Sequence, residues 1–180
     1  MKVLIDTCVM YPTVMRVVVL GVAATGAFTP LWSSRILEEW ARAARKLGPG
    51  GEAQARGEIA TLRIDWPKAE VVWKPSLESR LWLPDPNDVH VLAAAVASSA
   101  DVILTLNASD FPRNVLADEG LSRADPDAFL LGHWQAQPEV VAGVCDSVLE
   151  EARRLSGQSW EMRALLKKAR LPRLAKAVTS

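Results

Sequence analysis

Short apolar runs of the kind that form buried strands occur along the first two thirds of the chain. They are KVLIDT (2–7), PLWSS (30–34), AEVVW (69–73), DVILTL (101–106) and, as a fifth, edge strand, LSRAD (121–125). Runs of this length bounded by turn residues are typical of strands that are buried on both faces. The clearest of the five is the run at 101–106.

Segments with helical spacing of apolar residues separate these runs. The predicted helices span 12–26, 34–47, part of 48–64, 87–99 and 113–119. In the helix at 34–47, Ser33 or Ser34 supplies the N-terminal cap, and Gly48 with Pro49 ends it. Strands that alternate with helices predict an α/β sandwich with a mostly parallel sheet flanked by helices.

From Pro138 onward the pattern is purely helical, with one amphipathic helix at 138–157 and another at 159–178 that is broken near Pro172. We therefore predict an α/β domain at 1–133 and a helical, basic extension at 134–180. Residues 161–180 carry a net charge of +5 although the whole chain is neutral. This tail is a solvated helix that packs on the body, a binding segment for a protein partner, or a contact for nucleic-acid phosphates. All three interpretations stay open.

The composition limits the cellular setting. Cys8 and Cys145 lie far apart and form no metal or disulfide spacing, which favours a reduced, cytoplasmic protein. Residues 17–34 carry no charge, but glycines, a proline and four hydroxyl residues interrupt them. Their continuously apolar part is too short for a bilayer, so we expect no membrane association.

Four separate regions bring acidic or amide side chains toward one edge of the predicted sheet. They are Asp6 after the first strand, Glu38 and Glu39 on the helix at 34–47, Asp88 at the start of the helix at 87–99, and Asn107 with Asp110 after the strand at 101–106. The carboxyl ends of parallel strands share one edge, where ligands bind in such folds. Crowded carboxylates favour a bound cation, and oxygen ligands favour Mg²⁺ or Mn²⁺. Such a site suits metal-assisted attack of water on a phosphodiester.

Each acid also has a purely structural interpretation. Asp88 complements a helix dipole, Asp85 shapes the turn before Pro86, and Glu39 can pair with Arg35 one turn earlier. We favour metal binding for Asp88 and a turn role for Asp85. Because adjacent helical residues point in different directions, only one of Glu38 and Glu39 can face the site, and the other should be solvated.

Other polar residues near these acids have weaker claims. Asn107 and Asp110 are also common turn formers, and Thr105 at the strand end can orient a carboxylate or a water. His90, in the alanine-rich helix, is expected to be a packed or surface histidine. Cys8 has no base beside it in the sequence, so we do not expect it to be a nucleophile.

VLIDTCVMYPT, WSSRILEEW, LPDPNDVHVLAAAVASSADVILTLNASDFP and LSRADPDAFL together resemble the PIN domain family, with the closest likeness to VapC-type toxins. The resemblance covers about residues 1–133 and lies in the order and spacing of the motifs. It implies a three-layer PIN-like fold and a cytoplasmic Mg²⁺- or Mn²⁺-dependent endoribonuclease that acts on RNA. It also implies the toxin of a toxin–antitoxin pair, inhibited by a cognate antitoxin, and is compatible with a homodimer.

The resemblance assigns the metal ligands to Asp6, Glu39, Asp88 and Asp110, with Thr105 and Asn107 in support. The chain departs from the family pattern at Asn107, because many PIN domains carry an acid there. Asp110, three residues further on, takes that charge in the N-x-x-D-F form. Because one acid of the pattern is missing, the alternative interpretation is a non-catalytic PIN-like module that binds protein or RNA. A phosphohydrolase or phosphoacceptor domain is disfavoured, because the segment after Asp6 lacks the second aspartate that one such phosphatase class uses.

Overall fold

The computed structural model describes residues 1–180, which form two compact units. The first unit comprises Met1–Tyr11 and Thr29–Arg123, and the second comprises Pro12–Phe28 and Ala124–Ser180. Packing thus groups residues 12–28 with the C-terminal part of the chain, a long-range association that the sequence did not indicate. The functional division at residue 133 stays a prediction.

A five-stranded parallel sheet forms the centre of the first unit. Its strands are β1 (Lys2–Ile5), β2 (Thr29–Ser33), β3 (Glu70–Val71), β4 (Val102–Leu104) and β5 (Ser122–Ala124), in the order β3-β2-β1-β4-β5. All five strands and the parallel arrangement were predicted from the sequence. β3 is shorter than the predicted run at 69–73, because its partner β2 ends at Ser33, opposite Val71, where the next helix begins. β1 is central, and Val3, Leu4 and Ile5 are fully buried.

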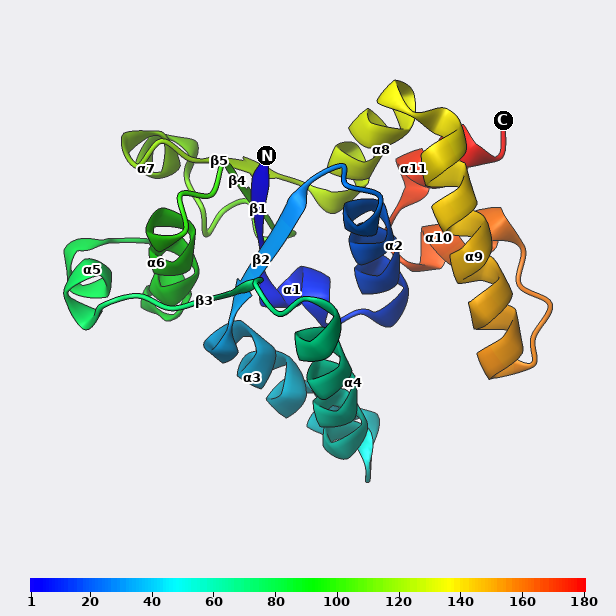
Figure 1. Cartoon of the computed structure of the whole chain (residues 1–180), viewed down its shortest axis with the longest axis horizontal. Helices are drawn as coiled ribbons and strands as arrows, with labels where there is room; N and C mark the ends of the chain where they lie inside the picture. Colours follow the sequence, from blue (N-terminus) through cyan, green and yellow to red (C-terminus); the bar gives the residue numbers. More distant parts are fainter. The chain divides into compact units, whose positions relative to one another are not determined.

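Helices flank this sheet in the first unit (Figure 1). They are α1 (Thr7–Met10), α3 (Ser34–Ala43), the 3-10 turn η1 (Ala44–Leu47), α4 (Gly51–Asp65), α5 (Pro75–Arg80), the 3-10 turn η2 (Pro86–Asp88), α6 (Val89–Ala97) and α7 (Arg113–Asp118). α3 begins where the Ser33 hydroxyl accepts from the Ile36 amide at 3.1 Å, which confirms the predicted cap. α6 packs against β1, β2 and β4, so its small apolar residues are buried on the sheet.

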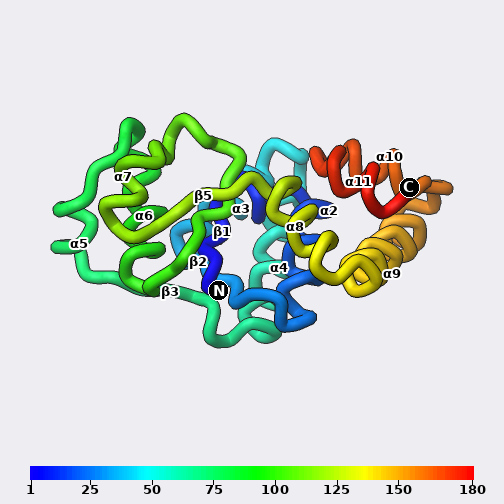
Figure 2. The backbone as a smooth tube through the Cα atoms, turned by 90° about the horizontal axis from the view of Figure 1, so that it is seen from above, coloured from blue at the N-terminus to red at the C-terminus, as the bar shows by residue number.

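The second unit is entirely helical. It contains α2 (Thr13–Ala24), α8 (Pro126–Ala136), α9 (Pro138–Ser156), α10 (Met162–Lys168) and α11 (Pro172–Val178). α10 and α11 pack against each other, α10 also contacts α9, and α11 contacts α8 (Figure 2). α2 packs closely on α9, since a Cβ at Gly21 would lie 2.6 Å from Cγ1 of Val144. The predicted break near Pro172 is confirmed.

Three helices were not predicted. α1 has only four residues, too few for a helical period to be recognised, and α5 has no buried residue, so it has no apolar face to detect. α8 is capped by the preceding Asp125, whose carboxylate accepts from the Ala128 amide at 3.1 Å. Its sequence, PDAFLLGHWQA, shows no clear amphipathic stripe. None of the helices in either unit has both the length and the apolar character needed to cross a membrane.

Candidate active site

Asp6 lies directly after β1, at the carboxyl end of the sheet, and only 4% of it is exposed. One carboxylate oxygen accepts from the Thr7 amide at 2.7 Å, and the other accepts from the Thr105 hydroxyl at 2.8 Å. The Cys8 thiol donates to the same second oxygen at 3.3 Å. Three donors therefore fix the orientation of this carboxylate.

Burial raises the pKa of Asp6, and the hydrogen bonds from Thr105, Cys8 and Thr7 offset only part of that rise. The negative charge of Glu39 raises the pKa of Asp6 further. Removing a carboxylate from water disfavours its charged form, and a neighbouring like charge acts in the same direction. A cation bound beside Asp6 would act in the opposite direction and lower the pKa of this carboxyl.

Thr105 follows β4 and connects Asp6 to the loop that contains Asn107 and Asp110. Its hydroxyl donates to Asp6 and accepts from the Asn107 amide at 3.0 Å. The Asn107 carbonyl in turn accepts from the Asp110 amide at 3.1 Å. Asn107 is itself exposed, so its backbone shapes the turn that positions Asp110 beside the strand end.

Glu39, on α3, is held by groups from three helices. Its Oε2 accepts from the Thr7 hydroxyl at 2.7 Å, and its Oε1 lies 2.7 Å from His90 Nε2. Arg35 Nε lies 3.8 Å from the same Oε1. Burial raises the pKa of Glu39, but the contacts with His90 and Thr7 and the charge of Arg35 outweigh it, so the pKa is lowered. Glu39 is therefore a fixed, charged acceptor.

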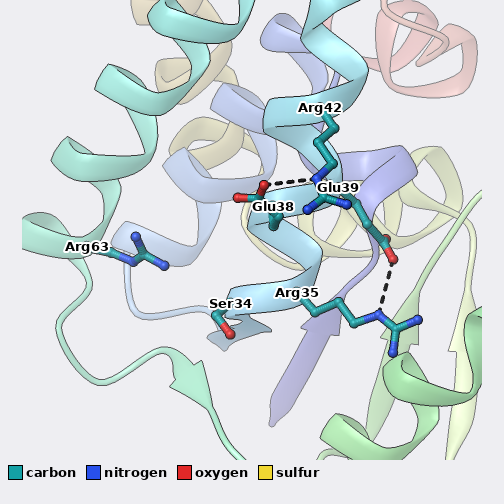
Figure 3. A pocket seen from close by; sticks show the side chains of 6 residues that line it. All are labelled: Ser34, Arg35, Glu38, Glu39, Arg42 and Arg63. Carbon is teal, nitrogen blue, oxygen red and sulfur yellow. Dashed lines mark hydrogen bonds and ion pairs between the residues drawn. The ribbon is translucent and has the colours of Figure 1, made fainter.

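Glu38 points away from this group and belongs to a surface ion-pair network (Figure 3). It lies 3.0 Å from Arg42 Nε and 2.8 Å from Arg56 Nη1. The hydrogen bonds from Arg56 and Arg42 lower the pKa of Glu38 to about 2. The structure thus separates the two adjacent glutamates as the helical geometry requires, with Glu39 on the side of Thr7 and His90.

Asp85 and Asp88 have different surroundings. The Asp85 carboxylate accepts from the Asn87 amide at 2.9 Å and so stabilises the turn of η2. Asp88 precedes α6 but makes no side-chain capping hydrogen bond. Burial raises the pKa of Asp88 to about 6, and the charges of Asp6, Asp85 and Asp110 contribute to the rise. A capping role therefore accounts for the position of the Asp85 side chain, but not for that of Asp88.

The four predicted ligands act on one another electrostatically without forming a ready-made metal cage. Asp6 and Asp110 both raise the pKa of Asp88, and Glu39 raises that of Asp6. As the side chains stand, no group of three or more His, Cys, Asp or Glu residues is arranged to hold a metal ion. The four side chains offer only oxygen atoms, which are the ligands that Mg²⁺ and Mn²⁺ prefer. To bind one ion together, the side chains would have to rotate toward it.

An open groove of about 580 Å³ lies beside Glu39. Its lining comes from α3 and α4 and comprises Ser34, Arg35, Glu38, Glu39, Arg42 and Arg63 (Figure 3). The arginines in it are paired with acids, Arg35 with Glu39 and Arg63 with Glu70. A polyanion in this groove would meet guanidinium groups beside the acidic side chains.

Sequence reasoning underrated Thr7 and His90. His90 is 1% exposed, which agrees with the expected packed histidine, but its contact with Glu39 was not predicted. Its position among alanines and valines was the available signal, because a polar side chain on a fully buried helix needs a polar partner. Cys8 is consistent with expectation: burial and the charge of Asp6 raise the pKa of its thiol to about 12, so it stays protonated.

A model of the PIN domain matches residues 2–109, which include β1 to β4 and every predicted site residue except Asp110. This chain belongs to the PIN domain family. It is also 37% identical over 67 residues to the protein named "Putative ribonuclease VapC50" from Mycobacterium tuberculosis (strain ATCC 25618 / H37Rv). That match covers 35% of this chain and 40% of its relative. No solved structure matches the chain significantly.

Proposed function

We propose that this PIN-domain protein is a metal-dependent endoribonuclease that hydrolyses phosphodiester bonds of RNA. The observation that carries the proposal is the arrangement of three acids at the carboxyl edge of the sheet: Asp6 after β1 and Asp110 in the loop after β4 both lie close enough to Asp88 to raise its pKa. Perturbed carboxylates that act on one another at the carboxyl edge of a parallel sheet are typical of a functional site. The membership in the PIN family and the ribonuclease name of the relative support the same activity.

In this proposal Asp6, Glu39, Asp88 and Asp110 hold Mg²⁺ or Mn²⁺. When bound, the ion activates a water and stabilises negative charge on the phosphate and the leaving oxygen. Thr105 fixes the carboxylate of Asp6, while Thr7 and His90 fix that of Glu39. Asn107 positions Asp110 through its backbone. Asp6 and Glu39 are therefore oriented before the ion binds, whereas Asp88 and Asp110 would turn toward it on binding.

The groove beside Glu39 is the proposed site of the RNA that flanks the scissile bond. Arg35 and Arg42 can pair with phosphate oxygens there, in exchange for their present glutamate partners. Such an exchange is inexpensive, because exposed ion pairs contribute at most about 1 kcal/mol each.

The deciding experiment is cleavage of a mixed RNA pool by the purified protein with Mg²⁺ or Mn²⁺ and with EDTA. Asp88→Asn and Glu39→Gln should abolish metal-dependent cutting. Asp85→Asn and Glu52→Gln are matched controls, since they carry the same chemical change at acids that serve a turn and a surface ion pair outside the groove. Unchanged cutting in Asp88→Asn would refute the proposed site. A folded protein that neither cuts RNA nor takes up Mn²⁺ would support the alternative, a non-catalytic PIN-like binding module.

We propose further that the protein is the toxin of a toxin–antitoxin pair, silenced in the cytoplasm by a cognate antitoxin. The VapC-type likeness of the motifs supports this role. Expression in a bacterial host should then arrest growth, and Asp88→Asn should relieve the arrest. Growth that is unaffected by an active nuclease would contradict the toxin role but not the ribonuclease activity. A homodimer, also proposed, is tested by light scattering on the purified protein.

A further inference from the structure

The last two helices carry exposed cations that have no acidic partner. Arg163, Lys167, Arg170, Arg173 and Lys176 are all exposed, and no ion pair involves any of them. We call these five residues the C-terminal basic surface. By contrast, six arginines of the first unit each lie within ion-pair distance of a glutamate: Arg35, Arg42, Arg45, Arg56, Arg63 and Arg80.

The positions of these cations follow from the packing of α10 and α11. Leu165, Leu166, Leu171 and Leu174 are buried within the second unit and form the apolar side of both helices. Arg163 and Lys167 are four residues apart on α10, and Arg173 and Lys176 are three apart on α11, so each pair shares one exposed helix face. The apolar side is already used for packing, and charge is what this segment presents to a partner.

Arg170 lies in the tight turn between the two helices, in a backbone conformation that favours glycine. Its φ is +64°, and the Leu171 amide donates to the Leu166 carbonyl at 2.9 Å across the turn. The chain uses Gly157 with φ +66° for the corresponding position at the end of α9. A non-glycine side chain is strained in this conformation, because its Cβ comes too close to the backbone. The chain thus keeps a positive charge at a site where glycine would be more stable.

We propose that the C-terminal basic surface, which belongs to the second unit, binds the phosphate backbone of single-stranded RNA. This inference rests on the proposed function, since it gives the same enzyme a second, sequence-independent contact with its substrate. Separate Lys and Arg side chains along two helices match the repeating charges of a phosphate chain. No large apolar side chain of residues 157–180 is exposed. A membrane-surface helix would need such an apolar face.

Binding is measured by fluorescence anisotropy with a labelled single-stranded RNA. All proteins carry Asp88→Asn, and EDTA is present, so that binding is observed without cleavage. The test variants are Arg170→Gly and the double variant Arg163→Gln/Lys167→Gln. Their matched controls are Arg154→Gln and Arg45→Gln/Arg154→Gln, which remove the same charge from arginines already paired with Glu151 and Glu52. Urea unfolding of each variant reports stability.

Each phosphate contact to a single strand changes the slope of log K against log salt by about 0.7, which corresponds to about fivefold in affinity between 1 M and 0.1 M salt. We therefore expect Arg170→Gly to weaken binding about fivefold at 0.1 M salt, and the double variant about 25-fold, with slopes reduced by about 0.7 and 1.4. Arg170→Gly should be at least as stable as its parent, so its loss of affinity would not reflect unfolding. The controls should bind RNA like the parent.

Unchanged affinity and slope in the test variants, or equal losses in the controls, would overturn the proposal. So would loss of binding to anionic lipid vesicles with RNA binding intact, because that result assigns the surface to a membrane. Cleavage is assayed separately in the chain that retains Asp88. RNA binding that depends on the basic surface without any cleavage would refute the nuclease and leave this inference standing. Cleavage with the same KM in wild type and in the double variant would refute this inference and leave the nuclease activity standing.

Discussion

The imidazole of His90 lies 2.7 Å from Glu39 through its Nε2 and Oε1 atoms, and it is almost completely buried while the carboxylate is 39% exposed. The N–H is not aligned ideally for a hydrogen bond, and Nδ1 has no partner. The contact with Glu39 is thus the one close polar contact of this ring. His90 links α6, which follows Asp88, to the glutamate of α3, and so connects two of the proposed metal ligands.

Replacement of His90 should weaken metal binding even though His90 is not itself a proposed ligand. His90→Leu removes the contact that orients Glu39, and the loss of such an orienting partner typically costs 10- to 100-fold in metal affinity. We expect about tenfold weaker Mn²⁺ binding by calorimetric titration. His90→Gln, whose amide can donate to Oε1, should recover part of the affinity. Identical Mn²⁺ affinities in wild type, His90→Leu and His90→Gln would show that Glu39 needs no such support.

The raised pKa of Asp88 predicts a stability cost in the metal-free protein. A carboxyl whose folded pKa is about 6 instead of 3.8 stabilises the fold at low pH, and this contribution is lost as the pH rises through about 6. Asp88→Asn should therefore stabilise the metal-free protein at pH 7.5, by about 1 kcal/mol after solvent screening of this partly exposed group. Thermal unfolding in EDTA should show a Tm about 2–4 °C higher than wild type. At pH 4 the two proteins should differ little.

The same group predicts a pH dependence of metal binding. Protons compete with the ion for Asp88, so Mn²⁺ affinity should fall as the pH decreases through about 6. Calorimetric titrations at pH 5.5 and 7.5 test this expectation. The pH effect should be smaller in Asp88→Asn, whose amide does not titrate in this range. An affinity independent of pH in the wild type would argue against Asp88 as a ligand.

Asp127 should be important for the stability of the second unit. It is buried, and its two carboxylate oxygens accept from the Arg173 and Leu174 amides, each at 2.9 Å, at the start of α11. Asp127→Ala leaves both amides without this acceptor and should cost about 2 kcal/mol of unfolding free energy. Hydrogen exchange should increase first in α11. Asp127→Asn, which keeps one acceptor oxygen, should lose less stability than Asp127→Ala.

Cys8 should be dispensable for catalysis. Its thiol has a pKa of about 12, and only a thiolate is a competent nucleophile. Cys8→Ser keeps a donor toward Asp6 and should retain wild-type RNA cleavage, and the wild-type thiol should react slowly with iodoacetamide at pH 7.5. Fast alkylation that abolishes cleavage, together with an inactive Cys8→Ser, would reassign this residue to the chemistry.

The sequence by itself determined where the strands and most of the helices lie along the chain, because apolar periodicity, the Ser33 cap and the break at Pro172 act over a few residues. It also indicated which acids lie at one sheet edge, since Asp6 and Asp110 both follow parallel strands. Short α1 and unpatterned α8 escaped prediction, because neither contains a recognisable helical period.

The tertiary structure alone decided the partners of the side chains. It placed Thr7 and His90 against Glu39, paired Glu38 with Arg42 and Arg56, and grouped residues 12–28 with the C-terminal helices. It also showed that the basic tail buries its leucines and leaves its cations exposed. These outcomes depend on contacts between residues far apart in the chain. Local periodicity restricts such contacts to a face of a helix or an edge of a sheet, but only packing selects which side chains meet.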